Sequence, residues 1–176
     1  DIVRNGRLWE RITPSLAPAP IVPERDGVME TILHLELGWG ARGTSHRWLG
    51  EVALDGGDIL RVEPRFRGQE IVSPLEGEDA AHPLPHISFE GGVVRFEVTA
   101  EANPNNVTPA TQGVALHIRS APDANIRARL AGQDIAVRVE RLLEGALSGN
   151  LGAIDSPAYR FHALPRPHEW QWGGTV

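Results

Sequence analysis

Histidine, glutamate and arginine side chains recur at spacings that could bring them together on a sheet. His34 and Glu36 alternate with leucines in one run, and His117 and Arg119 alternate with apolar residues in another. Alternate residues of a strand point to the same face, so these side chains would line one groove if the two runs pair. Imidazole and carboxylate groups can exchange protons or bind metals. The alternative is a polar sheet face that another part of the chain covers.

A second pair of histidines, His82 and His86, has the i, i+4 spacing that places two metal ligands on one face of a helix. Pro83 and Pro85 exclude a helix here, so we interpret the pair as part of a polar loop. A small metal-dependent enzyme built on the strand and loop histidines is therefore the least favoured hypothesis, and no metal site is predicted.

Four tryptophans lie beside loops or near the C-terminus. Trp39 and Trp48 flank a glycine-rich segment that contains His46, and Trp170 and Trp172 would point the same way on a strand. Such rings could stack on a sugar, and they could equally anchor the core or a domain interface. The sequence leaves both alternatives open.

Three arginines, Arg61, Arg65 and Arg67, lie close together in the segment 61–67, which is a candidate for anion binding. Arg65 and Arg67 share a face if the segment is a strand, and their guanidinium groups could hold a phosphate or a carboxylate of a neighbouring domain. A surface network of ion pairs is the alternative. The binding candidates are Trp39, His46, Trp48, Arg65, Arg67, His117, Trp170 and Trp172.

The chain lacks the residues of several catalytic classes. It has no cysteine and no lysine, which excludes thiol catalysis, disulfides and Schiff-base chemistry. We find no nucleophile elbow, phosphate-binding loop or dinucleotide fingerprint. No catalytic residue and no cofactor is therefore predicted, and we expect that the chain is not an enzyme by itself.

The length of 176 residues suits one domain with a core of its own. A formal net charge of −6 argues against nucleic acid or an anionic membrane as a partner. No apolar run has transmembrane length, and no signal peptide is visible. These features favour a cytoplasmic protein, with secretion as the alternative. The chain opens inside what reads as a strand, from which we expect a piece of a longer protein.

Alternation of apolar and polar residues predicts the elements that would position these side chains. A period of two is typical of strands with one buried face, and it occurs at 33–37, 94–98, 114–119, 126–130 and 135–139. Turn signals separate the runs at 55–58, 91–92 and 132–133. The pattern predicts an all-β, antiparallel β-sandwich of about eight to ten strands, jelly-roll or immunoglobulin-like.

The predicted organisation has two parts. Residues 1–27 are expected to form an N-terminal strand and a proline-rich arm, because four prolines between positions 13 and 23 exclude a helix or a central strand. Residues 28–176 are expected to form the sandwich domain. The segment 140–147 is the best helical candidate, with the continuation of a strand as the alternative.

Several short stretches are similar to parts of a known family. They lie at 1–6 (Asp-Ile-Val-Arg-Asn-Gly), 48–51, 62–64, 156–162 and 169–170. Together they resemble the C-terminal β region of bacterial metal-dependent hydrolases of the polymerase-and-histidinol-phosphatase (PHP) superfamily. The resemblance implies that the metal-binding histidines and aspartates lie in an upstream domain. None of the superfamily's His-x-His motifs occurs here, so no catalytic residue carries over.

The leading hypothesis is therefore a non-catalytic accessory domain of a larger protein, attached to a metal-dependent hydrolase. The alternative is an independent carbohydrate-binding module that uses tryptophan and arginine side chains. The expected partners are the upstream domain of the same parent protein or a second copy of the chain, with a sugar or a phosphate as ligand.

Overall fold

The computed structural model consists of strands and one short helix in the part of the chain that it describes. That part comprises residues 2–4, 7–14, 27–41, 43–66, 85–101, 111–152, 154–164 and 172–175. No helix within it is long and apolar enough to cross a membrane. Its strands form two sheets in which every pairing is antiparallel. The predicted antiparallel all-β class is confirmed.

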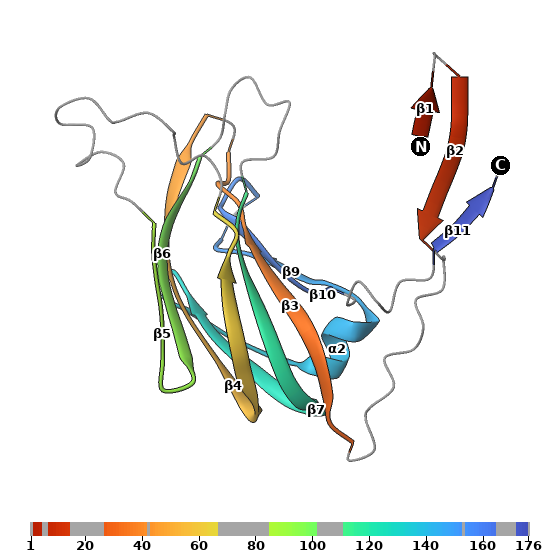
Figure 1. Cartoon of the computed structure of the whole chain (residues 1–176). Coiled ribbons are helices and arrows are strands. Elements are labelled where there is room, and N and C mark those ends of the chain that lie inside the picture. Colours follow the sequence, from red (N-terminus) through yellow and green to blue (C-terminus); the bar gives the residue numbers. More distant parts are fainter. Residues whose placement is uncertain are drawn as a thin grey trace.

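A three-stranded sheet joins segments from the two ends of the chain (Figure 1). Its strands, in spatial order, are β1 (Ile2–Arg4), β2 (Arg7–Pro14) and β11 (Trp172–Thr175). Trp172 of β11 lies opposite Pro14 of β2 in the ladder. The sequence pattern predicted a strand near the N-terminus, but not its pairing with the last strand.

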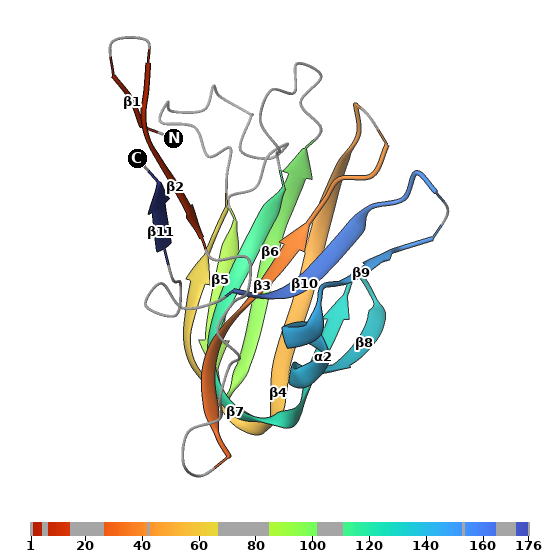
Figure 2. The same cartoon turned by 90° about the vertical axis from the view of Figure 1, so that its right-hand side faces the viewer.

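The larger sheet has eight strands. They are β3 (Met29–Leu37), β4 (Ser45–Pro64), β5 (His86–Glu90), β6 (Val93–Glu101), β7 (Gln112–Leu130), β8 (Gln133–Arg138), β9 (Leu147–Asn150) and β10 (Ala158–Leu164). The order is β5-β6-β4-β7-β3-β10-β9, and β8 pairs with β7 outside this path. Figure 2 shows β4, β7, β3 and β10 side by side.

The two longest strands, β4 and β7, pair along most of their length with shifts in register. The shifts fall between Asp55 and Gly57 and between Ile59 and Arg61. An irregularity of this kind bends a strand and increases its twist. The sequence predicted a turn at 55–58, and this is wrong, because the segment lies inside β4. Since all eight strands belong to one hydrogen-bonded sheet, a sandwich of two separate sheets, jelly-roll or immunoglobulin-like, is not confirmed.

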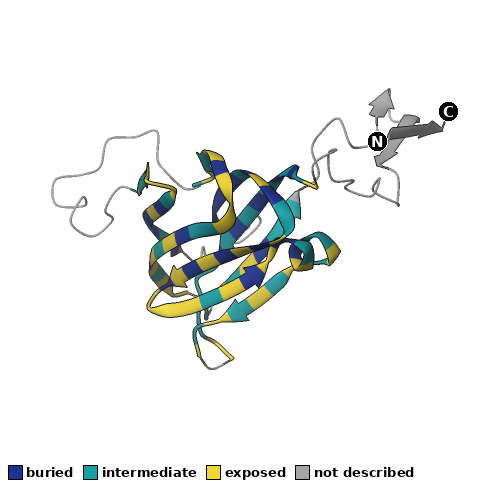
Figure 3. Ribbon diagram, turned by 90° about the horizontal axis from the view of Figure 1, so that it is seen from below, coloured by how far each residue is buried: buried dark blue, intermediate teal, exposed yellow. Residues whose placement is uncertain are grey.

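One face of the larger sheet is apolar and forms the core. Leu33, Leu35 and Leu37 are buried, as their alternation predicted, and Trp48 and Phe161 are the largest fully buried side chains. Figure 3 shows buried and exposed residues alternating along the strands. Burying one large apolar side chain contributes about 1.5–3 kcal/mol to folding. The opposite face of the sheet carries mostly polar side chains.

The helix α2 (Val139–Glu144) overlaps the candidate segment 140–147 but begins one residue earlier and ends three residues sooner. Val139 and Leu142 are buried in the core, and the helix contacts β7, β8 and β10. It therefore covers part of the apolar face. The chain then returns to the sheet as β9.

Candidate functional site

The outward side of β4, β7, β3 and β10 carries a cluster of ionisable side chains, which we call the polar face. Its members are Arg61, Glu63, Arg65, His117, His34, Glu36, Arg160 and His162. The register explains why they meet. Glu63, Ala115, His34 and His162 form one cross-strand row, because each lies opposite the next in the ladder.

The next row of the polar face is built on Gly113 of β7. Glu36 lies opposite Gly113 and also opposite Arg160, and the backbone N–H of Arg65 donates to the Gly113 carbonyl at 2.8 Å. A Cβ atom at position 113 would lie 2.6 Å from His34 Nε2. Because Gly113 has no side chain, the His34 ring can lie over β7 at this position.

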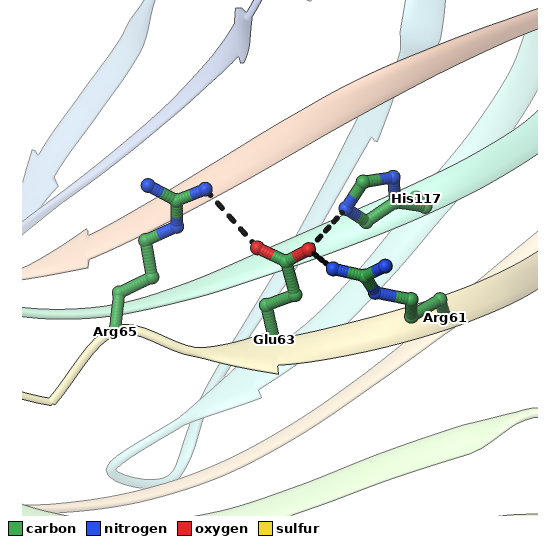
Figure 4. A network of polar contacts seen from close by, with 4 residues as sticks. All are labelled: Arg61, Glu63, Arg65 and His117. Atoms are coloured by element: carbon green, nitrogen blue, oxygen red, sulfur yellow. Dashed lines mark hydrogen bonds and ion pairs between the residues drawn. The ribbon is translucent and has the colours of Figure 1, made fainter.

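Glu63 is the centre of one half of the polar face (Figure 4). Its Oε1 atom lies 3.0 Å from His117 Nε2 and also contacts the Arg61 guanidinium, and its Oε2 atom accepts from Arg65 Nη2 at 3.1 Å. Burial, and then the positive charges of Arg61 and Arg65, lower the pKa of His117 below its usual 6.5. This half therefore holds a neutral imidazole beside a shared carboxylate near neutral pH.

Glu36 is the centre of the other half. Its Oε2 atom accepts a hydrogen bond from Arg160 Nε at 2.5 Å and lies 3.5 Å from His162 Nε2. The rings of His34 and His162 are neighbours across the β3–β10 ladder, with centroids 5.1 Å apart. His34, Glu36 and His162 each offer one possible ligand atom, and these three atoms lie within 4.8 Å of one another.

Both histidines of the Glu36 half are neutral near pH 7. Burial lowers the pKa of His34 to about 4, against the opposing effect of Glu36, and His162, Arg65 and Arg160 lower it further. Burial also lowers the pKa of His162, with Glu36 opposing and Arg160 adding to the effect. Each ring therefore keeps one nitrogen with a free lone pair.

The polar face offers little for acid–base or nucleophilic catalysis. Each of its two carboxylates already contacts arginine, so neither is placed to take a proton from a substrate. Among the described residues, no serine or threonine hydroxyl hydrogen bonds to His117 or His34. Such a contact is the mark of an activated nucleophile. What the face can do is bind a cation through imidazole and carboxylate, or an anion through arginine.

The structure brings some of the sequence-predicted residues together and not others. His117 and Arg65 belong to the polar face, and β3 pairs with β7 as the groove hypothesis of His34 and Glu36 required. Arg67 and Trp170 lie outside the described residues, and only the backbone of Trp172 is described, in β11.

Trp48 is a core residue. Its side chain is fully buried, and its Nε1–H donates to the Gly38 carbonyl at 2.7 Å. His46 packs against it edge-on at 4.9 Å, and burial lowers the pKa of His46. Trp39 is half-buried against the core. For Trp48, the core alternative is therefore correct, because a buried ring cannot stack on a ligand.

The hypothesis of a metal site from strand and loop histidines does not fit the part of the chain that is described. His86 is the first residue of β5, where it lies exposed opposite Glu97, and β6 and β4 separate it from β7. His82 lies outside the described residues. His34 is instead joined by His162 of β10.

Glu63, Arg160 and His162 were missed as members of the site. A signal existed for β10, where Arg160 and His162 alternate with Tyr159 and Phe161. That alternation is the same pattern that identified the other strands. No signal in the sequence alone placed β10 beside β3.

No protein-family model, curated protein or solved structure matches the chain. The resemblance to the PHP superfamily thus gains no support from these comparisons, and it stays an expectation from short motifs.

Proposed function

We propose that the chain is a non-catalytic binding domain of a larger protein and that the polar face is its binding surface. The observation that carries this proposal is the convergence of eight ionisable side chains on one side of the sheet, seven from four strands and Arg65 from just beyond the end of β4. Three of them are histidines whose pKa is lowered, so they offer uncharged nitrogens beside arginines and carboxylates.

A non-catalytic role is supported by the way in which these groups are arranged. Glu63 is shared among Arg61, Arg65 and His117, and this holds the side chains in place. A general base needs a carboxylate or imidazole that can reach a substrate proton and is matched to the working pH. A carboxylate bound by two arginines suits recognition and positioning better than proton transfer.

The larger protein in this proposal is a metal-dependent hydrolase, and the support for it is the motif resemblance described above. In such a protein the polar face would bind the upstream domain, a second copy of the chain, or a phosphate-bearing ligand. A carbohydrate-binding module is not favoured by the described residues, because the buried Trp48 removes one of the rings on which it depended.

A thermal-shift screen of the purified chain tests the proposed function. The panel holds divalent metals, simple and polymeric sugars, and phosphate esters. A ligand at a hundredfold excess over its Kd stabilises the folded state by about 2.7 kcal/mol, which gives a readable shift. We expect one class to shift the unfolding temperature of the wild type, and Arg65→Ala or His162→Ala to reduce that shift.

The matched control is Arg129→Ala, which removes an exposed arginine from the end of β7 far along the chain from Arg65. It should leave the shift unchanged. A folded protein that no class stabilises would contradict the proposal. So would hydrolysis of a phosphate ester by the chain that His117→Ala abolishes, because the face would then be an active site.

A further inference from the structure

Three side chains of the polar face are arranged as metal ligands. His34 and Glu36 are two positions apart on β3 and point to the same side, and His162 is the direct cross-strand neighbour of His34 on β10. Direct cross-strand neighbours have Cβ atoms about 5 Å apart, so this triangle is compact and fixed by the backbone ladder. Three ligands from two rigid strands need little ordering when a metal binds.

The distances between the ligand atoms are close to those that a metal requires. Tetrahedral zinc with ligand bonds of about 2.1 Å places neighbouring ligand atoms about 3.4 Å apart. His162 Nε2 and Glu36 Oε2 already lie 3.5 Å apart. The third atom, from His34, lies within 4.8 Å of both, so a small rotation of its ring completes the triangle.

Two ring nitrogens at this place are buried. His34 Nε2 and His162 Nε2 are buried and have no hydrogen-bond partner among the described residues. A buried polar atom without a partner is costly, and it calls for a ligand, an ion or a water molecule.

We propose that His34, Glu36 and His162 bind a divalent transition-metal ion, of which Zn²⁺ is the first choice. Two imidazoles and one carboxylate favour zinc and its neighbours over Mg²⁺ or Ca²⁺, which prefer oxygen ligands. Three protein ligands leave a fourth position, which would take water or a donor atom from a partner. This inference deepens the proposed function and rests on it: the metal is what the polar face uses to hold its partner.

Arg160 is the competitor for this site. Its guanidinium hydrogen bonds to the Glu36 oxygen that the metal would use, and its side chain is 52% exposed. Zn²⁺ and the guanidinium would compete for the same oxygen of Glu36. Bound metal should therefore displace the Arg160 side chain toward solvent. Removing Arg160 should therefore strengthen metal binding, a result that a purely structural cluster would not give.

The experiment is a calorimetric titration of the purified, tag-free chain with Zn²⁺ at pH 7.5. We expect one saturable site per chain. Glu36→Gln and His162→Ala should each weaken binding at least about tenfold, since losing one of three ligands removes a large share of the affinity. The matched control, His86→Ala, removes an exposed histidine of β5 outside the polar face and should bind as the wild type does. Arg160→Ala should bind more tightly.

The outcomes separate this inference from the proposed function. Circular dichroism establishes that each variant is folded, and Glu36→Gln keeps the size of the side chain should His162→Ala fail to fold. Absence of saturable Zn²⁺ binding to the folded wild type would overturn the metal site, as would equal losses in His86→Ala and Glu36→Gln. If phosphate esters or sugars still stabilise the chain through Arg65, the proposed function survives without the metal. If no ligand class binds, both proposals fail.

Discussion

The absent side chain of Gly113 sets the position of a candidate ligand. A Cβ atom at position 113 would lie 2.6 Å from His34 Nε2, 3.3 Å from the Leu35 carbonyl oxygen and 3.4 Å from Arg65 Cβ. Gly113 is buried beneath these groups. The glycine is therefore required by close approach of a side chain, which no local pattern in the sequence reveals.

We expect Gly113→Ala to displace the His34 ring and to destabilise the fold by about 1–3 kcal/mol, the usual cost of inserting a methyl group into a packed site. Urea denaturation measures the loss of stability, and Zn²⁺ affinity should fall in the same variant. The double variant Gly113→Ala/His34→Ala should regain part of the stability, because the clash is gone. A single variant as stable as the wild type would contradict the contact.

The pKa of His117 can be used to test the effect of the neighbouring arginines on a single residue. Its pKa is lowered by burial and then by Arg61 and Arg65, while Glu63 at 3.0 Å is shared with both arginines. Arg61→Gln removes one positive charge from beside the ring, so the pKa of His117 should rise toward 6.5. An NMR titration of the imidazole protons measures it, with Arg129→Gln as the control. An unchanged or lower pKa would show that Arg61 does not act on His117.

At the scale of elements, alternation predicted the strands that have one polar face. It identified the buried leucines of β3 and the inward side chains of β7 because period-two burial leaves a direct trace in the sequence. It failed at 55–58, where two glycines mark an irregularity within β4 instead of a turn. Glycines serve both purposes, and only the partner strand decides between them.

The assembly of the candidate site was less predictable than its parts. His34 and Glu36 were assigned to one face correctly, but β10 lies more than a hundred residues further along the chain, and β-strand pairing at that distance leaves no local signal. The sequence could therefore propose a polar face and could not say that His162 completes it.

Trp48 shows how an element is anchored. It lies on the inward side of β4, is fully buried, and donates a hydrogen bond to Gly38 just after the end of β3. Trp48→Ala should destabilise the domain by about 3–5 kcal/mol, as truncation of a large buried aromatic side chain does. The control is Leu49→Ala at the next position, which is 53% exposed and should cost little. A Trp48→Ala variant that keeps wild-type stability would contradict its core role.

At the scale of the whole molecule, segments far apart in the sequence build both sheets. The two ends of the chain pair in the three-stranded sheet, and the polar face draws on four strands from β3 to β10. A surface assembled in this way exists only in the folded state. Its ionisable groups therefore link binding to folding, and the pH dependence of stability should report on them.

His117 of the polar face and His46, which packs against Trp48, both lie outside the proposed metal site and both contribute to this pH dependence. Burial lowers the pKa of both below the usual 6.5, so between the folded and unfolded values the unfolded chain binds more protons than the folded one. The free energy of unfolding must then rise with pH in this window and fall as the pH drops below about 6.5.

Urea denaturation of the metal-free protein at pH 7.5 and 5.5 measures this fall in the free energy of unfolding. The lower pH, 5.5, stays above the range where the carboxylates of the unfolded chain titrate. The double variant His46→Gln/His117→Gln should show a smaller fall than the wild type. A stability that stays level or rises on acidification would mean that these rings are not held neutral by the fold.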